Sequence, residues 1–265
     1  MRSITSRQNP IVRAFRELTS EASANGSRLL LDGVHLVQEA RSAGLEVERI
    51  AVSAAHLVNS SEIASLADSM ARAGADVIAV SPSVMSAISP VKTPTGIVAI
   101  VKRHPVAIAD ICRQANPFIV APVDVQDPGN LGALLRAAEA GGATGAAVCG
   151  ASASPFSWKA VRGSMGSVLR LPVAAGVSPD AVLESARKFQ LRTIASVARN
   201  GKPPEAIDWR GGVVLFVGGE GHGLADEIAD ACDVRVSIPM QAPVESLNVA
   251  VAAGLLVYEA RRTRT

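Results

Sequence analysis

A glycine-rich loop near the end of the chain combines close backbone access with one charged side chain. The loop is Gly218-Gly219-Glu220-Gly221-His222-Gly223-Leu224, and it follows the apolar run Val213–Val217. Four glycines let the backbone come close to a ligand or to another chain segment. Glu220 places one carboxylate in the same loop. This pattern predicts binding through backbone groups, with a carboxylate that can hold a neighbouring group.

A second polar turn follows the next apolar strand along the chain. The strand is expected over 234–240, and the turn after it carries Ser246 and Asn248. A helix of small residues is then predicted from Ser246 to Arg262. Two strand ends that are each followed by such turns predict a site at the carboxyl edge of a parallel sheet. As an isolated pair, Ser246 and Asn248 are more simply explained as N-caps of that helix.

The glycine-rich loop does not have the dinucleotide-binding pattern. Gly219 and Gly221 would need a glycine at position 224, which is Leu224. No acidic residue stands at the spacing of a ribose-binding carboxylate. A nicotinamide-dependent oxidoreductase is therefore disfavoured, and calorimetry with a nicotinamide dinucleotide would test that exclusion.

The composition is that of a globular chain with an aliphatic core. Of 265 residues, 48% are hydrophobic, 19% are charged and 3% are aromatic, which is enough apolar material for one large domain or two ordinary ones. The scarcity of aromatic side chains argues against a platform that stacks the bases of single-stranded nucleic acid. No stretch of about 18 apolar residues occurs, so no membrane-spanning segment is expected.

Three widely separated cysteines, Cys112, Cys149 and Cys232, indicate neither a zinc site nor a disulfide framework. We expect each to be a small core residue, and we predict no metal. Reduced cysteines and an N-terminus that does not have the pattern of a signal peptide predict a cytoplasmic location.

Basic residues crowd the N-terminus although the net charge is only +2. The cluster consists of Arg2, Arg7, Arg13, Arg16 and Arg28. A basic arm of this kind can grip phosphates, and a solvated tail is an equally good interpretation.

Strands alternate with helices through both halves of the chain, which predicts two α/β domains. In the first half, strands are expected at 28–33, 47–52, 77–80 and 96–101, with helices between them. In the second half, extended segments are expected at 117–125, 146–149, 168–173, 193–197 and 213–217. We expect a first domain over 1–105 with the basic arm, a linker over 106–116 and a second domain over 117–265.

Three stretches of the second half together resemble a known family. They are Asn130-Leu131-Gly132-Ala133-Leu134-Leu135-Arg136, the loop 218–224, and Ile238-Pro239-Met240 followed by Ser246-Leu247-Asn248. In this order and spacing they resemble the three motifs of the SpoU/TrmH branch of the SPOUT RNA methyltransferases. The first half is similar to that family's RNA substrate-binding, L30e-like domain, through the segments 4–10 and 32–40.

The resemblance implies a fold, a cofactor and a site. The fold is a C-terminal parallel-sheet domain with a deep trefoil knot, plus a smaller N-terminal L30e-like α/β domain. The activity is transfer of a methyl group from S-adenosyl-L-methionine to a ribose 2′-hydroxyl of RNA, by a homodimer. The implied cofactor contacts are Gly218, Gly219, Ile238, Met240 and Leu247. The implied catalytic set is Arg136, Asn130, Glu220, Ser246 and Asn248.

Arg136 is the arginine that the resemblance places at the 2′-hydroxyl. The hydroxyl must lose its proton and lie in line with the methyl group. An arginine base is disfavoured because the guanidinium pKa exceeds about 12, and a clamp on the adjacent phosphate fits the side chain at least as well. In either role, Asn130 would orient Arg136 or the nucleotide, and Glu220 would hold Arg136 or anchor the loop.

The sequence departs from the family pattern at one place in the third motif. Ala242 stands where the family usually has glycine, and Pro243 follows it. An alanine at positive φ would be mildly strained, so we expect a differently shaped turn there.

Three functions stay open at this point. Methylation of 23S ribosomal RNA is favoured, because the first domain resembles a ribosomal protein. A transfer RNA 2′-O-methyltransferase is the first alternative. A non-catalytic RNA-binding or ribosome-assembly paralogue is the second, and the intact set of chemical residues counts against it.

Overall fold

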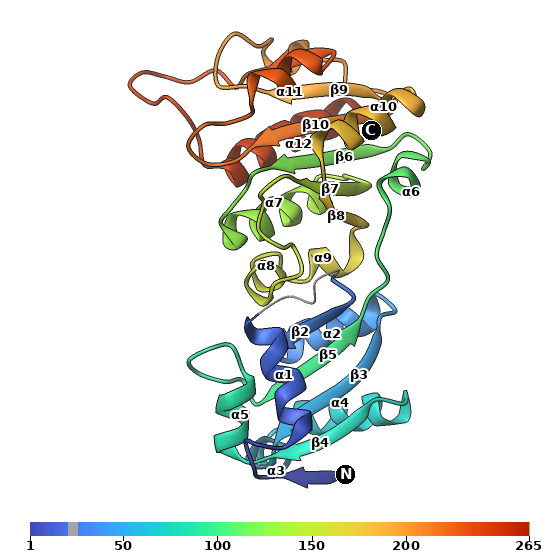
Figure 1. The fold of residues 1–265 in the computed structure, drawn as a ribbon, viewed down its shortest axis with the longest axis vertical. Coiled ribbons are helices and arrows are strands. Elements are labelled where there is room, and N and C mark those ends of the chain that lie inside the picture. The colour runs from blue at the N-terminus through green and yellow to red at the C-terminus, as the bar shows by residue number, and fades with distance from the viewer. Residues whose placement is uncertain (21–25, 265) are drawn as a thin grey trace. The chain divides into compact units, whose positions relative to one another are not determined.

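The computed structural model describes residues 1–20 and 26–264 and divides them into two compact units. The first unit takes in Met1–Pro105 together with Phe156–Arg162, and the second takes in Val106–Pro155 and Gly163–Thr265. Figure 1 shows that each unit is built on its own sheet with helices on both faces. The predicted α/β class is confirmed. Within the described residues, no helix is long and apolar enough to cross a membrane.

The first unit is organised around a five-stranded mixed sheet in the order β1-β4-β3-β5-β2. The strands are β1 (Arg2–Ile4), β2 (Arg28–Asp32), β3 (Glu46–Ser53), β4 (Asp76–Val80) and β5 (Ile97–Lys102). The strands β1, β4 and β3 run parallel, and β5 pairs antiparallel with both β3 and β2. A run such as Ile97–Val101 is buried along its whole length, as expected for a strand covered on both faces.

Five helices of the first unit come from segments that connect its strands. They are α1 (Pro10–Ser20), α2 (Val34–Ser42), α3 (Ala54–Asn59), α4 (Ser61–Arg72) and α5 (Pro82–Ile88). The apolar faces of α1 and α5 pack on one side of the sheet, where Phe15 and Ile88 join one core cluster. Serine side chains cap α4 and α5, because Ser60 and Ser81 accept hydrogen bonds from the backbone N–H groups of Ile63 and Val84.

The prediction of a basic arm at the N-terminus is wrong for residues 2–4, which form a strand of the sheet. Residues Arg2–Ile4 pair in parallel with Ile78–Val80, because the edge of β4 offers unpaired backbone groups and Ile4 is buried. Arg2 is also paired with a carboxylate, at 2.7 Å from Asp76 Oδ2. A strand of three residues is too short for its sequence to reveal it.

The second unit contains a six-stranded parallel sheet in the order β11-β9-β10-β6-β7-β8. Its strands are β6 (Phe118–Val123), β7 (Gly145–Cys149), β8 (Val173–Val177), β9 (Arg192–Ser196), β10 (Val213–Gly218) and β11 (Val234–Val236). The helices are α6 (Ile108–Cys112), α7 (Pro128–Ala140), α9 (Ser167–Arg170), α10 (Pro179–Lys188), α11 (Asp226–Ala231) and α12 (Val249–Arg264). The chain also forms α8 (Trp158–Gly163) and the short helix η1 (Pro204–Ala206).

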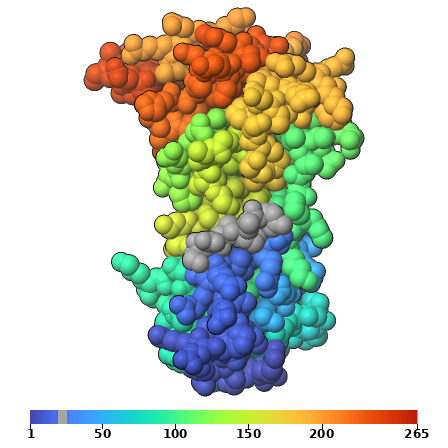
Figure 2. Space-filling model, viewed as in Figure 1, coloured from blue at the N-terminus to red at the C-terminus, as the bar shows by residue number. Residues whose placement is uncertain are grey.

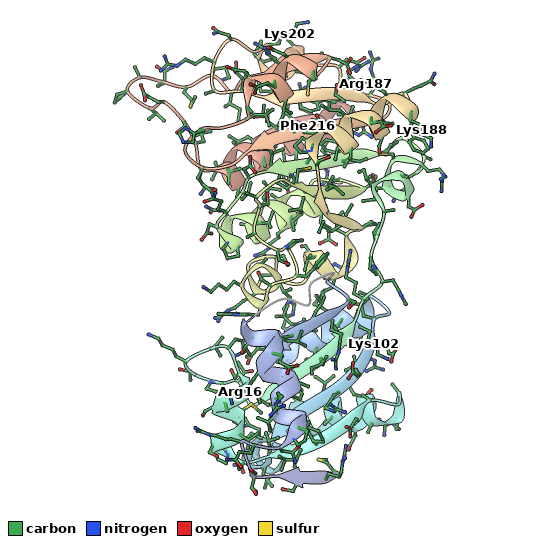
Figure 3. All side chains as sticks on the ribbon, viewed as in Figure 1. Arg16, Lys102, Arg187, Lys188, Lys202 and Phe216 are labelled. Carbon is green, nitrogen blue, oxygen red and sulfur yellow. The ribbon has the colours of Figure 1, made fainter. Side chains whose placement is uncertain are left out.

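Phe216, labelled in Figure 3, marks the core on one face of this sheet. It belongs to a buried cluster that also draws on the apolar faces of α6, α10 and α11. On the other face, α7 packs against α12, and Trp209 meets the ring of Phe118 edge to face. Cys112 and Cys149 lie in the cluster and Cys232 packs against it, so the prediction that the cysteines are core residues is confirmed.

Several expected boundaries in the second half are corrected by the structure. The segment 168–173, expected to be extended, instead begins with the short helix α9, and the strand lies later at Val173–Val177. Gly166 starts that helix with φ 89°, a conformation open to glycine that no apolar pattern reveals. The strand expected over 234–240 stops at Val236, and the last helix begins at Val249 rather than Ser246.

The segment 106–116 is packed rather than a bare linker. It carries α6, whose Ile111 and Cys112 are buried in the core cluster of the second unit. A helix of only five residues is too short for its apolar periodicity to be recognised in the sequence.

Candidate functional site

The strands β6 and β10 are neighbours at the centre of the second sheet, and they are where its strand order reverses. The chain runs outward from β6 through β7 to β8, then crosses to β9 and β10 on the other side of β6. The last pair in register is Gly218 with Val123, so both strands end at the same edge. A reversal of this kind opens a crevice at the carboxyl ends of the strands. The sequence-predicted loops meet at this edge (Figure 1).

The glycine-rich loop is shaped by backbone contacts that leave no room for side chains. A Cβ on Gly218 would lie 2.1 Å from backbone atoms of Gly223 and Leu224, and one on Gly219 would lie 2.0 Å from Asp124 O. Gly219 and Gly223 form an isolated bridge, which closes residues 220–222 into a narrow tip. Gly221 and Gly223 turn that tip with φ values of 97° and 69°. The glycines are therefore required by close backbone approach, as the pattern predicted.

Three polar side chains from separate segments form one hydrogen-bonded chain. Asn130 Nδ2, in the first turn of α7, donates to Glu220 Oε1 at 2.7 Å. Asn248 Nδ2, just before α12, donates to Asn130 Oδ1 at 3.0 Å. The amide of Asn130 thus uses both its donor and its acceptor to join loops that are 90 and 118 positions away in the sequence. The structure brings these three predicted residues together.

Helix capping places two members of this chain. Asn248 Oδ1 accepts from the backbone N–H groups of Ala250 at 2.9 Å and Val251 at 3.4 Å, so the residue also caps α12. Asp127 caps α7 by accepting from Asn130 N at 2.7 Å, which fixes the backbone that carries the Asn130 amide. Sequence reasoning did not single out Asp127, although an aspartate directly before Pro128 is a helix-start signal.

Two predicted residues stand outside the hydrogen-bonded chain. Arg136 is exposed on α7 and makes no ion pair within the described residues, so Glu220 holds Asn130 and not Arg136. Ser246 is exposed and has no hydrogen-bond partner in the part of the chain that the structure describes. The capping role open to both Ser246 and Asn248 therefore belongs to Asn248 alone.

The five residues expected to contact the cofactor share one environment. All are half-buried and lie at or after the carboxyl ends of β10 and β11: Gly218, Gly219, Ile238, Met240 and Leu247. Residues after β11 form the red-orange projection at the upper left of Figure 2. In that turn Val244 N donates to Gln241 O at 3.1 Å, the Ala242–Pro243 bond is cis, and Ala242 is not at positive φ. Ala242 therefore avoids the strain that a positive φ would cause.

A third loop at this edge was missed by sequence reasoning. It follows β9, and Ser237 fastens it to the segment after β11 by donating to Gly201 O at 3.0 Å and accepting from Gly201 N at 3.2 Å. A Cβ on Gly201 would lie 2.5 Å from backbone atoms of Val236 and Ser237. The Asn200-Gly201 pair was a turn signal that could have pointed to this loop.

The edge is formed largely by backbone groups of three loops. The three loops present backbone N–H and C=O groups, half-buried apolar side chains and the exposed carboxylates of Glu220 and Glu245, the second of which pairs with Arg199 at 3.5 Å. This mixture suits an elongated ligand with polar ends and an apolar body. Within residues 1–20 and 26–264 no group of three side chains could hold a metal ion. Arg136 supplies a cation that is free to meet an anionic partner.

Family comparisons assign both halves of the chain. Residues 117–258 match the sequence model of the SpoU rRNA Methylase family, and residues 9–99 match that of the MRM3-like substrate binding domain. These matches confirm the resemblance drawn from the three motifs.

Comparisons with whole proteins agree over the full chain. An uncharacterized tRNA/rRNA methyltransferase of Synechocystis, slr1673, is 32% identical over 98% of this chain and 93% of its own. The 23S rRNA (guanosine(2553)-2′-O)-methyltransferase RlmP of Bacillus subtilis is 29% identical over 98% and 100%. The AdoMet-bound rRNA methyltransferase of Sinorhizobium meliloti superposes with a TM-score of 0.87 at 30% identity, covering 98% of this chain and 97% of that one.

Proposed function

The chain belongs to the SpoU rRNA methylase family, and we propose that it methylates a ribose 2′-hydroxyl of 23S ribosomal RNA. It is an S-adenosyl-L-methionine-dependent RNA methyltransferase. The observation that carries the proposal is the Asn130–Glu220–Asn248 chain, because it joins the three family motifs at one edge of the sheet. Ribosomal RNA is favoured over transfer RNA because a relative that matches over its whole length is named for 23S rRNA.

The cofactor's fit to this edge rests on the shape of the loops. S-adenosyl-L-methionine supplies an electrophilic methyl group on a sulfonium. Gly218 and Gly219 would meet it through their backbone, and Ile238, Met240 and Leu247 would cover its apolar parts, since all five are half-buried there. The trefoil knot implied by the family resemblance stays a prediction.

The chemistry assigned to the chain's own residues is positioning and charge. The 2′-hydroxyl would have to lie in line with the methyl group that the bound cofactor would supply, and its proton would pass to solvent. Arg136 would clamp the phosphate next to that ribose, because its guanidinium is exposed and free of ion pairs within the described residues. Asn130 would orient the nucleotide, while Glu220 and Asn248 hold Asn130 in place.

We propose that the active form is a homodimer built on α12. Three large apolar side chains, Val251, Leu255 and Tyr258, are each about half exposed, at 51%, 51% and 52%. Their spacing of four and three residues puts them on one face of the helix. Such a stripe is costly to leave in water and suits a self-complementary contact. Sedimentation should give a dimer, and Leu255→Lys should give a monomer; a wild-type monomer would contradict the assignment.

The two family matches also suggest a role for each domain. We propose an RNA substrate-binding domain over 1–105, a connecting segment over 106–116 and the methyltransferase domain over 117–265, supported by the two family matches. A cytoplasmic location is supported by the three free cysteines.

The decisive experiment is transfer of labelled methyl from S-adenosyl-L-methionine to total RNA from cells that lack this protein, followed by nucleoside analysis. We expect a 2′-O-methylated nucleoside in 23S rRNA. The label appearing only in transfer RNA would move the substrate to the first alternative. Arg136→Ala should keep cofactor affinity and lose transfer by a factor of about 10² or more. If wild-type protein binds RNA but neither binds the cofactor nor transfers methyl, the non-catalytic alternative holds.

A further inference from the structure

A cavity of about 580 Å³ in the first unit is separate from the edge described above. Its volume falls within the range of about 300–1,000 Å³ that small-ligand pockets have. Part of its lining comes from the loop that leads from α5 into β5 (Figure 1), and part from Trp158 and Arg162 of the segment counted with this unit. The cavity therefore needs its own explanation.

The floor of the cavity is fixed by one carboxylate. Ser89 Oγ donates to Asp32 Oδ2 at 2.6 Å, and Thr95 Oγ1 donates to Asp32 Oδ1 at 3.1 Å. Asp32 thus ties down both ends of the loop 89–96, whose conformation Pro90 and Pro94 restrict further. The loop is held in place before any ligand arrives, which lowers the entropy cost of binding.

The walls and the rim have different characters. Leu30, Leu36 and the half-buried ring of Trp158 give the cavity an apolar and aromatic side. Lys92 and Arg162 stand exposed at its rim, and neither makes an ion pair within the described residues. Lys159 adds a third cation, with Nζ 5.7 Å from the centre of the Trp158 ring.

We propose that this cavity binds one unpaired nucleotide of the RNA substrate, with the base against Trp158 and its phosphate between Lys92 and Arg162. The proposal rests on the RNA methyltransferase function proposed above and adds a second RNA contact far along the sequence from the methyl-transfer site.

Charge fixes the orientation of such a nucleotide. A phosphate is attracted to the two cations of the rim and repelled by Asp32, so it stays at the mouth. The base then enters, because every base has a face that stacks on an aromatic ring. The Asp32 carboxylate can only accept hydrogen bonds when it is ionised, which favours a base with an amino group. One ring is enough for a single nucleotide, although it makes no platform for a longer strand.

Tryptophan fluorescence gives a direct readout. The chain has two tryptophans, and Trp209 is fully buried while Trp158 lines the cavity. We expect 23S rRNA from cells that lack this protein to quench emission of the wild-type chain, because a stacked base quenches the indole. Trp158→Phe should abolish the RNA-dependent change. Quenching that persists in Trp158→Phe would come from Trp209 and would overturn the assignment.

RNA affinity tests the base and the phosphate separately. Trp158→Leu should weaken binding to the same 23S rRNA about tenfold, whereas Trp158→Phe should stay within about threefold. The double variant Lys92→Ala/Arg162→Ala should lower the slope of log affinity against log salt by about 0.7, the value for one lost phosphate contact to a single strand. Arg72→Ala is the matched control, because Arg72 is exposed on α4 of the same unit and outside the cavity lining.

The outcomes separate this proposal from the proposed function. Cofactor affinity should be unchanged in all of these variants. If RNA affinity is also unchanged in both Trp158→Leu and the double variant, the cavity assignment is overturned, while the methyl-transfer function still stands. A second result would also overturn it, in favour of a free nucleotide as the ligand. In that result guanosine monophosphate, detected by quenching of Trp158, binds with the same affinity as RNA, and RNA affinity is unchanged in Trp158→Leu. If wild-type protein transfers no methyl group, the proposed function fails, and the affinity measurements still decide the cavity.

Discussion

The carboxyl edge of the second unit and the cavity of the first unit are built from different chemical material. At the edge, backbone approaches backbone so closely that Gly218, Gly219 and Gly201 have no space for a Cβ. In the cavity, the shape comes from side chains, with Asp32 fastening a loop through two hydroxyl groups. Added atoms should therefore damage the edge, and removed atoms should damage the cavity.

The difference also separates the two parts of the proposed reaction. A site made of backbone is rigid and depends little on side-chain identity, which suits a cofactor that is the same in every turnover. A pocket made of side chains can change one contact at a time, which suits recognition of a particular RNA. Substitutions in the two regions should therefore affect different measurements.

The largest effect is expected for Gly219→Ala. The new Cβ would lie 2.0 Å from Asp124 O and 2.5 Å from Asp124 C, both backbone atoms that cannot rotate away. The loop must shift, so cofactor binding measured by calorimetry should be lost, and the second unit should be destabilised by about 3 kcal/mol or more. Unchanged cofactor affinity in this variant would show that the edge tolerates added atoms and would remove the contrast with the cavity.

A smaller loss is expected in the cavity for Ser89→Ala. Ser89 is 9% exposed and donates to a carboxylate, so the free energy of unfolding of the first unit should fall by about 1.5 kcal/mol, measured by denaturation followed through Trp158. Ser86→Ala is the matched control, because the Ser86 hydroxyl is exposed and donates only to Pro82 O of its own helix. Cofactor affinity should not change in either variant, and a change would contradict the separation of the two regions.

The loss of stability in Ser89→Ala should depend on pH in a defined direction. Burial raises the pKa of Asp32, and the hydrogen bonds from Ser89 and Thr95 oppose that rise. A folded-state pKa above the unfolded value means that stability is fully present at low pH and declines as the carboxyl ionises. Removing Ser89 raises the pKa further, so the stability deficit of Ser89→Ala should grow as the pH rises above the unfolded-state pKa of about 4. A deficit that stays constant as the pH rises would show that the lost bond does not act through Asp32.

The sequence predicted the order of strands and helices better than the contacts between them. Apolar runs such as Val213–Val217 are local signals, so β10 was identified. β1 escaped because its pairing with β4 depends on a neighbour that no local pattern reveals. The segment 168–173 was assigned as extended because it is apolar, and the turn that Gly166 makes at positive φ overrode that preference.

The candidate site was predicted from motifs, and its connections came from the structure. Spacing alone could not tell that Glu220 would bind Asn130 instead of Arg136, since the two partners lie on the same helix α7. It also could not divide the roles of Ser246 and Asn248, because both types of residue cap helices. Only tertiary packing distinguishes these alternatives.

Asn248 both caps α12 and donates to Asn130, so its variants can separate the stability of the edge from its role in methyl transfer. Asn248→Ala should lose the cap of α12 and cost about 1 kcal/mol in thermal or chemical unfolding. Asn248→Ser keeps a capping oxygen and removes the amide that donates to Asn130. Methyl transfer should fall in both variants, whereas stability should fall only in the alanine variant. Full activity of Asn248→Ser would mean that the bond to Asn130 is not needed for the reaction.

The smallest effect, and the one of opposite sign, is expected for Gly254→Ala in α12. A Cβ there would lie 3.7 Å from Ala137 Cβ, an ordinary contact, and alanine favours a helix interior over glycine by up to about 1 kcal/mol. Gly141 is the matched position at the same α7–α12 contact, where a Cβ would lie 2.1 Å from Val257 Cγ1 and the substitution should destabilise. The midpoint temperature of thermal unfolding should be higher than that of the wild type for Gly254→Ala and lower for Gly141→Ala. Cofactor affinity should be unchanged for Gly254→Ala. If Gly254→Ala also lost cofactor binding, glycine would be required throughout the second unit, and close backbone approach would no longer distinguish the carboxyl edge.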